Sequence, residues 1–214
     1  LISFLKMIQH QILMSSSSCR RPYAEESRMD EGVLHTNALF TIESCMHVYK
    51  VIKLCWYHDG RLHREDDRPA EIWYLENGSI MAKKWWRNGQ LHRVDGPAMI
   101  ISYEGGTIAH YWCRDGRPYQ EDDKPAEIWY RENGTIIMQK WYRDGRLHRE
   151  DDKPAEIGYS ENGTIMIQSW WRNGLLHRVD GPAGTLELRW YRDGQLHRDE
   201  DLPAVIEYSD TGTI

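Results

Sequence analysis

The chain has 214 residues, a formal net charge of −6, ten tryptophans and four cysteines. The negative charge disfavours phosphate backbones and anionic lipids, so we expect no nucleic-acid partner and do not favour a membrane partner. The cysteines form no CxxC pair, which argues against a zinc ribbon or a disulfide framework and favours a reducing, cytoplasmic compartment.

The first 45 residues differ in kind from the rest, because all ten tryptophans lie after them. We predict that residues 1–45 are a leader that is largely disordered or a non-native extension. The apolar run within 1–14 is broken by polar residues, and residues 15–32 resemble a flexible linker. Residues 46–55 are predicted to be a degenerate partial repeat, and residues 56–214 the repeat array.

One pattern recurs through residues 56–214: Trp, an aromatic residue, Arg, Asx-Gly, Leu-His-Arg, an acidic stretch, Pro-Ala-x-Ile and a second turn. The units start near residues 56, 85, 112, 141, 170 and 190, at steps of 29, 27, 29, 29 and 20 residues. A period of this length indicates a repeat architecture in which each unit packs on its neighbours.

Turn chemistry predicts the secondary structure. Six Asx-Gly pairs, at 59–60, 88–89, 115–116, 144–145, 173–174 and 193–194, favour type I′ hairpin turns, in which both central residues need positive φ. Second turns follow at 77–78, 105–106, 133–134, 162–163 and 211–212, and the prolines at 69, 97, 125, 154, 182 and 203 are each expected to open a strand. The prediction is an all-β protein, an antiparallel β-hairpin repeat solenoid or elongated meander sheet.

The alternation of side chains predicts the register. A three-residue Glu-Asn-Gly loop would pair Ser160 with Thr164, Tyr159 with Ile165 and Ile157 with Ile167. One face is then almost wholly apolar: Ala155, Ile157, Tyr159, Ile165, Ile167, Trp171 and Leu176. The other is polar but carries indoles: Glu156, Thr164, Trp170, Arg172 and His177. We expect the sheet to twist or roll over its apolar face.

The segments WYRDGRLHREDDKPAEI (141–157) and ENGTI (161–165) resemble MORN-type repeats. They resemble more closely the variant W-Y-x-N-G-x-x-H-R-x-D-G-P-A repeats of uncharacterised giant-virus and phage proteins, which VDGPA at 94–98 and 179–183 matches. The resemblance covers 159 of the 214 residues. It implies a β-hairpin solenoid that acts as a scaffold, in a viral protein of the host cytoplasm or virion. Some MORN arrays associate with membranes or phospholipids, but this chain lacks the Gly-x-x-Tyr-x-Gly core of the standard unit.

Two recurring polar features have structural explanations. The histidines at 63, 92, 148, 177 and 197 lie at least two strand spacings apart, roughly 9–10 Å, so one zinc ion cannot bridge neighbours. We predict that they are cross-strand partners of the indoles, with Trp141 opposite His148. The acidic loops at 65–67, 121–123 and 150–152 lack EF-hand spacing, so we expect solvated charges that pair locally with Arg or Lys. No metal or other cofactor is predicted.

No cluster of acid, base and nucleophile stands outside the repeats, so we expect no enzyme and assign no catalytic residue. Trp, Tyr and Arg are enriched at binding hot spots, which makes the recurring aromatic and basic residues a candidate interaction surface. Alternatively, arginine planes stack on the indoles and cover the sheet. The candidate residues are Trp73, Trp129, Trp141, Trp170, Arg143, Arg146, Arg172, His148 and His177.

These observations predict a non-enzymatic scaffold that mediates protein–protein interaction. Its partner is an unknown protein or a second copy of the chain. A peripheral phospholipid-binding module is the alternative, and glycan binding through the tryptophans is a weaker one. Lipid binding should bring excess Lys or Arg, whereas residues 56–214 hold 21 Lys+Arg against 28 Asp+Glu, a net charge of −7.

Overall fold

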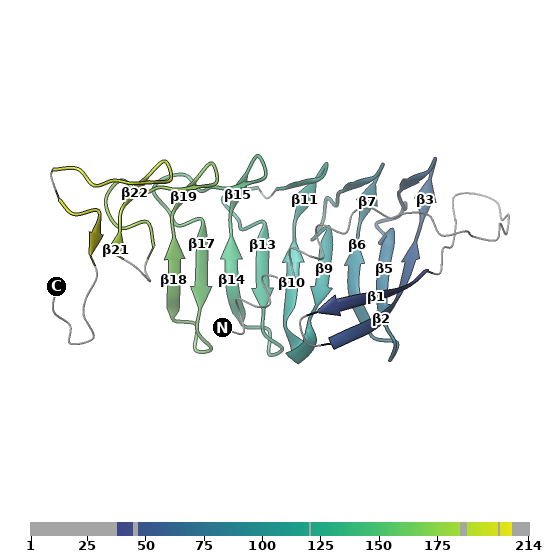
Figure 1. The fold of residues 1–214 in the computed structure, drawn as a ribbon. Coiled ribbons are helices and arrows are strands. Elements are labelled where there is room, and N and C mark those ends of the chain that lie inside the picture. The colour runs from purple at the N-terminus through teal and green to yellow at the C-terminus, as the bar shows by residue number, and fades with distance from the viewer. Residues whose placement is uncertain (1–37, 45–46, 120, 185–187, 201, 207–214) are drawn as a thin grey trace.

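The computed structural model describes residues 38–44, 47–119, 121–184, 188–200 and 202–206, with side chains from residue 51 onward. The protein is all-β, and its largest element is one antiparallel sheet of ten strands that follow each other in chain order (Figure 1). The strands are β1 (Ala38–Ser44), β2 (His47–Cys55), β5 (Glu71–Leu75), β6 (Ile80–Lys84), β9 (Met99–Ser102), β10 (Ile108–Tyr111), β13 (Glu127–Tyr130), β14 (Ile136–Lys140), β17 (Glu156–Tyr159) and β18 (Ile165–Ser169). This confirms the predicted elongated meander.

Six short hairpins form a second layer along one side of the sheet (Figure 1). They are β3 (Tyr57–His58) with β4 (Arg61–Leu62), β7 (Trp86–Arg87) with β8 (Gln90–Leu91), β11 (Cys113–Arg114) with β12 (Arg117–Pro118), β15 (Tyr142–Arg143) with β16 (Arg146–Leu147), β19 (Trp171–Arg172) with β20 (Leu175–Leu176), and β22 (Tyr191–Arg192) with β23 (Gln195–Leu196). A last pair joins β21 (Leu188–Arg189) to β24 (Val205–Ile206), and one 3-10 turn covers Glu104–Gly106. Each unit from one to four therefore contributes one hairpin and two sheet strands.

The sheet starts earlier in the chain than the sequence predicts. Residues 46–55 were expected to form a degenerate partial repeat, and β2 pairs with β5 as such a strand would. However, β1 lies inside the stretch 1–45 that we predicted to be a leader, and it pairs with β2 along its whole length. The rest of that predicted leader lies outside the described residues.

The Asx-Gly turns have the predicted backbone. At each of the six pairs both residues have positive φ, for example 50° at Asp144 and 77° at Gly145. Asn and Asp tolerate this left-handed region better than other side chains, and Gly has no Cβ to clash. The chain therefore reverses tightly at these points, and each hairpin is set by two residues.

The register at the second turns follows the prediction only close to the loop. Tyr159 pairs with Ile165, which confirms the three-residue loop. The residue that follows Ile165 has no partner in the paired strand. This β-bulge shifts the register and sets Ile157 opposite Gln168. The predicted pair of Ile157 with Ile167 is therefore wrong, because one extra residue moves everything beyond it to the other face. Units one and three carry the same bulge.

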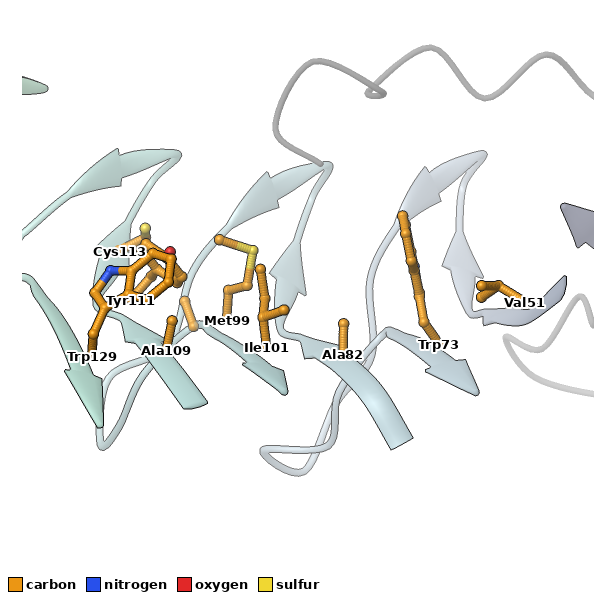
Figure 2. Packing of buried hydrophobic residues seen from close by; sticks show 10 residues of the cluster. Val51, Trp73, Ala82, Met99, Ile101, Ala109, Tyr111, Cys113 and Trp129 are labelled. Carbon is orange, nitrogen blue, oxygen red and sulfur yellow. The ribbon is translucent and has the colours of Figure 1, made fainter. Parts of the chain in front are cut away.

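The core lies between the sheet and the hairpins, on what we call the inner face of the sheet. Side chains rise from the strands toward the hairpins in Figure 2. The indole of Trp86, in β7, donates to the Glu71 carboxylate of β5 at 2.8 Å, so the two layers are in direct contact. The cluster in Figure 2 comprises Val51, Trp73, Ala82, Met99, Ile101, Ala109, Tyr111, Cys113 and Trp129.

The opposite, outer face of the sheet carries side chains that the sequence predicted to be covered. Tyr159 and Ile165 lie there, and Ile165 is 49% exposed. The inner face instead carries the charged residues Glu71 and Glu127, each at most 3% exposed. The prediction of which face is packed is therefore correct only in part, because Ala155 and Ile157 of the predicted apolar face are buried, whereas Ile165 is exposed. The inner carboxylates have partners within the core, which makes their burial tolerable.

Candidate functional site

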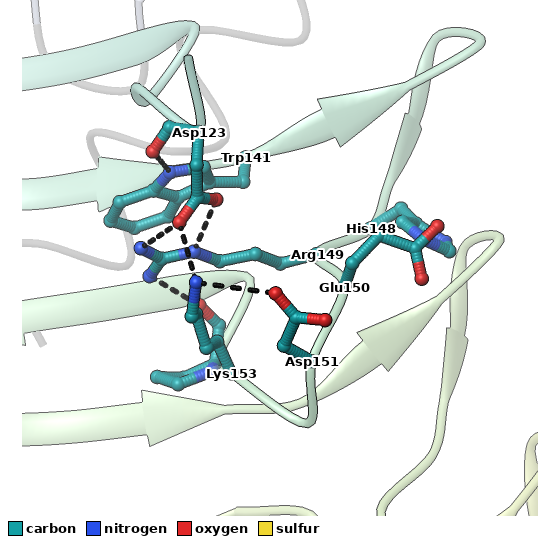
Figure 3. A network of polar contacts seen from close by, with 8 residues as sticks. Asp123, Trp141, His148, Arg149, Glu150, Asp151 and Lys153 are labelled. Atoms are coloured by element: carbon teal, nitrogen blue, oxygen red, sulfur yellow. Dashed lines mark hydrogen bonds and ion pairs between the residues drawn. The ribbon is translucent and has the colours of Figure 1, made fainter.

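The opening tryptophan of unit four sits in a contact that we call the indole clasp (Figure 3). The Trp141 indole is buried, and its Nε1 donates to the main-chain carbonyl of Asp123 at 2.9 Å. The Arg149 guanidinium lies 3.8 Å from the indole centroid and donates to the Asp123 carboxylate at 2.9 and 3.0 Å. Lys153 adds a contact to the same carboxylate at 3.0 Å. Asp123 belongs to unit three, so the clasp fastens adjacent units.

The clasp recurs along the array. The equivalent sets are Trp85 with Arg93 and Asp67, and Trp170 with Arg178 and Asp152. The hydrogen bonds from Arg93 and Arg149 hold the pKa of Asp67 and Asp123 below the ordinary aspartate range, although partial burial opposes this. These carboxylates were expected to pair locally, but their arginine partners lie 26 residues on, in the next unit.

The recurring histidines join each hairpin to the next. His148 Nδ1 accepts a hydrogen bond from the Asn173 main-chain N–H at 3.1 Å, and Gly174 N–H donates to the Leu147 carbonyl at 2.8 Å. We call this pair of bonds the hairpin stitch. His148 N–H also donates to the Trp141 carbonyl at 3.1 Å, which confirms their predicted cross-strand opposition. The imidazole, however, is used mainly to hold the neighbouring unit.

The nine candidate surface residues fall into a buried group and an exposed group. Each of the four tryptophans is 6% exposed and His148 is 5% exposed, so the expectation that they form an accessible surface is wrong. Trp73 and Trp129 lie on the inner face, and Trp141 and Trp170 lie under arginine planes, which confirms the alternative explanation. His177 is mostly buried. The exposed members are Arg143, Arg146 and Arg172, all on hairpins.

A buried ionic cluster lies on the inner face of unit one. Glu71 is 2% exposed, and its carboxylate lies 2.7 Å from Lys53 Nζ and 3.9 Å from Lys84 Nζ. It also accepts the indole N–H groups of Trp73 and Trp86, at 2.6 and 2.8 Å. Burial alone would raise the pKa of Glu71, but the two lysines and the hydrogen bonds outweigh burial and lower it. The carboxylate is therefore held ionised.

The cluster around Glu127 in unit three repeats this arrangement with two differences: Tyr142 stands in place of Trp86, and Ala109 occupies the position of Lys53. Glu127 accepts hydrogen bonds from Trp129 Nε1 at 2.5 Å and from the Tyr142 hydroxyl at 2.6 Å, and Lys140 Nζ lies 3.7 Å away. Sequence reasoning missed these clusters, although a signal was present. The spacing Glu-x-Trp places both side chains on one face of a strand, and the indole can then donate to the carboxylate.

The outer face is the second feature that sequence reasoning missed. Its central row alternates isoleucine with a polar residue, and a neighbouring row carries Tyr74, Ile80, Tyr159 and Ile165. Ile80 is 37% exposed and Ile165 is 49% exposed. The central row is Ile72, Lys83, Ile100, His110, Ile128, Gln139, Ile157 and Gln168, each opposite the next.

In the part of the chain that the structure describes, no three His, Cys, Asp or Glu side chains gather where they could hold a metal ion. The same part contains no helix long and apolar enough to cross a membrane. Compared with protein-family models, the chain matches none, and no curated protein matches it either. The likeness to MORN-type repeats therefore rests on the repeated residues alone.

Proposed function

We propose that this protein is a non-enzymatic repeat scaffold that binds a protein partner through the outer face of its sheet. The observation that carries the proposal is the composition of that face. An antiparallel sheet with one solvated face normally alternates apolar residues inward with polar residues outward. Here the outer face keeps an isoleucine in every second position of its central row.

The neighbouring row strengthens this argument. Ile52, Ile80 and Ile165 are 41%, 37% and 49% exposed, and each lies on the same side of the sheet. Isolated exposed apolar side chains are common, but a contiguous set on one face is typical of an interaction site. The described elements place hairpins on the inner face only, and the accessible isoleucines of the outer face are Ile52, Ile80 and Ile165, whereas Ile157 of the central row is buried.

The tryptophans support the proposal in a different way. They are the residues expected to dominate a binding surface, yet the structure uses them in the clasps and in the core. The rigid frame that they form holds the outer rows in a fixed order, and pre-organised surfaces bind with a smaller loss of conformational entropy. The proposed scaffold is thus a ladder of strands, ordered within each unit, with a repetitive face.

The test compares two surfaces of the full chain. Ile80→Lys with Ile165→Lys places charge on the outer face at exposed positions, whereas Arg143→Ala with Arg172→Ala alters the exposed hairpin arginines. Each variant is immobilised and challenged with extract from the source cells, and captured proteins are identified by mass spectrometry. We expect a stoichiometric partner that the isoleucine variant loses and the arginine variant keeps.

If the arginine variant loses the partner and the isoleucine variant keeps it, the binding site lies on the hairpins and not on the outer face. Capture of nothing by the wild type, together with sedimentation on phosphatidylserine vesicles, would favour the phospholipid-binding alternative. Circular dichroism of both variants checks that the sheet is retained, so a loss of binding reports on the surface and not on folding.

A further inference from the structure

Adjacent hairpins are joined by the same stitch at four of the five places where two described hairpins meet. The Gly N–H of one hairpin donates to a Leu carbonyl of the previous hairpin at 2.8–2.9 Å, and the preceding Asx N–H donates to a His Nδ1 at 3.1–3.3 Å. The Gly–Leu pairs are Gly89 with Leu62, Gly116 with Leu91, Gly174 with Leu147, and Gly194 with Leu176. The histidines are His63, His92, His148 and His177.

The junction between hairpins β11–β12 and β15–β16, which we call junction three/four, has no stitch. Among the described residues, none accepts a hydrogen bond from the main-chain N–H of Asp144 or Gly145. Packing differs as well. A Cβ placed on Gly174 would meet Arg146 of the previous hairpin at 3.5 Å, whereas a Cβ on Gly145 would meet nothing within 4 Å. Two hydrogen bonds are therefore missing at one place, and the space beside Gly145 is open.

The sequence explains this gap. Unit three carries Pro118 and Tyr119 where the other hairpins carry Leu and His. A phenol ring has no nitrogen to accept the incoming N–H, and it is larger than an imidazole. Tyr119 is instead engaged within its own unit, where its hydroxyl donates to Glu121 at 3.1 Å and Arg114 stacks 4.6 Å from its centroid. The substitution at Tyr119 thus accounts for the missing imidazole acceptor, whereas Pro118 keeps its main-chain carbonyl, so the missing Gly145 bond reflects the position of the hairpin and not the loss of an acceptor.

The sheet side of the same junction remains closed. Strands β13, β14 and β17 pair continuously, and the clasp of Trp141, Arg149 and Asp123 is reinforced by Lys153. The sheet edge of the junction is therefore fastened by strand pairing and the clasp, whereas the hairpin edge lacks the stitch and is held by Tyr142 of β15, whose hydroxyl donates to Glu127 of unit three. We infer that the array is hinged at junction three/four, so that its hairpin layer opens and closes there while the clasp and the sheet act as the pivot.

The hinge changes the shape of the array at a defined point. Closing the hairpin layer would tighten the sheet across units three and four, and opening it would flatten the outer face on the opposite side. Hinges absorb motion at a few residues while the flanking parts move as rigid bodies. The inference stands apart from the proposed function, because it concerns the motion of the chain alone and is tested without a partner.

Spin labels measure this motion directly. Gln90 and Arg146 occupy the same exposed hairpin position two units apart, and their separation includes junction three/four. Arg61 and Arg117 form the matched control, two units apart across stitched junctions only. Cysteines at either pair are labelled in a chain with Cys19→Ser and Cys45→Ser. Native Cys55 and Cys113 are buried, and burial with the nearby Glu127 charge raises the pKa of Cys113 to about 12, so its thiol stays unreactive.

We expect a broader distance distribution for the Gln90/Arg146 pair than for the control, with a tail to longer distances. Pro118→Leu with Tyr119→His supplies the missing stitch and should narrow the distribution to that of the control. Equal widths in the wild type would overturn the hinge. A broad distribution that the double variant leaves unchanged would also overturn it, because the breadth would then have another origin.

Amide hydrogen exchange provides a second readout that needs no label. In the wild type the amides of Asp144 and Gly145 should exchange much faster than those of Asn173 and Gly174, which occupy the same positions in a stitched hairpin. Equal protection of the two pairs would contradict the inference. Protection gained at Asp144 and Gly145 in the double variant would support it.

Discussion

Units one and two build the same part of the inner face from different chemistry. The unit-one set, which includes one residue from the start of unit two, has a carboxylate, a lysine and two indoles, whereas the unit-two set, which includes one residue from the start of unit three, has four residues without charge. In matching order these sets are Glu71, Trp73, Lys84 and Trp86 against Met99, Ile101, Tyr111 and Cys113. Lys84 and Met99 lie directly opposite each other in the sheet, so the charged set and the uncharged set are neighbours within one row of side chains.

The difference shows that the fold does not depend on the buried charges. Burying an ion pair removes both ions from water, and the attraction between them offsets that loss only if the remaining donors and acceptors are also satisfied. Glu71 meets this condition through its two lysines and two indoles. Unit two avoids the problem by having no charge in these positions. Either set fits the same backbone, but only in the ionic set does removal of one member leave a buried charge without its counter-charge.

The largest effect is expected from Glu71→Ala. It leaves the buried Lys84 without its counter-charge, removes one ionic partner of Lys53 and removes the acceptor of two indole N–H groups, so the free energy of unfolding should fall by about 3–5 kcal/mol. Urea unfolding followed by tryptophan fluorescence measures the loss. Glu104→Ala, at an exposed position, is the control and should change little. A loss below about 1 kcal/mol for Glu71→Ala would mean that the cluster is not a buried unit.

Met99→Ala tests the uncharged counterpart. Met99 is 1% exposed, and its truncation leaves a cavity that should lower the free energy of unfolding by about 2–5 kcal/mol. This loss arises from packing, so it should be the same at pH 7 and pH 4. A loss for Met99→Ala that grows at low pH would show that the two units are electrostatically coupled through Lys84.

Acid should weaken unit one more than unit two. The pKa of Glu71 is lowered in the folded chain, so its contribution to stability is complete above the unfolded value of 4.5 and is lost as the pH falls through the folded pKa below it. The free energy of unfolding should therefore decrease below pH 4.5. Asp67 and Asp123 have lowered pKa values too and contribute in the same direction. A pH titration of the urea midpoint measures the effect, and the Glu71 share is the part absent from a variant without that cluster.

The smallest effect is expected when the whole cluster is exchanged. A variant with Glu71→Met, Trp73→Ile, Lys84→Tyr and Trp86→Cys gives unit one the set found in unit two. Because all charged and donor groups leave together, its stability at pH 7 should remain within about 2 kcal/mol of the wild type. The same variant should show a shallower decline in acid. A loss as large as that of Glu71→Ala would show that each unit requires its own set.

The parts of the fold that the sequence predicts correctly depend on neighbouring residues. The turn at Asp144 and Gly145 needs a positive φ at both residues, and Asp followed by Gly is a pair of residue types that tolerates this conformation. The three-residue loop that pairs Tyr159 with Ile165 is equally local. The all-β class and the repeating hairpins follow from the recurrence of these turns.

The parts that the sequence does not predict depend on neighbouring units. Trp141 is buried because Arg149 lies over it and the Asp123 carbonyl accepts its N–H, and this clasp forms only when two units stack. The amino-acid sequence does not distinguish an indole that lies in a binding surface from an indole that is buried in a clasp. The bulge near Ile167 is a further case, since β18 itself contains no glycine or proline to mark the extra residue, and the bulge moves Ile167 to the face opposite Ile157.

The clasps and stitches reach one unit along the chain and no further, with sequence separations of 26 residues for the arginine–aspartate contacts of the clasps and 16 to 25 residues for the histidine bonds of the stitches. An architecture of this kind has a low contact order for a β protein, because no pairing has to wait for a distant segment. The loop closed by each clasp has nearly the same length, so the entropy lost on adding a unit is nearly constant along the array. Folding can then start at any well-formed unit and spread in both directions, with the unstitched junction as the place where the spreading front is expected to pause.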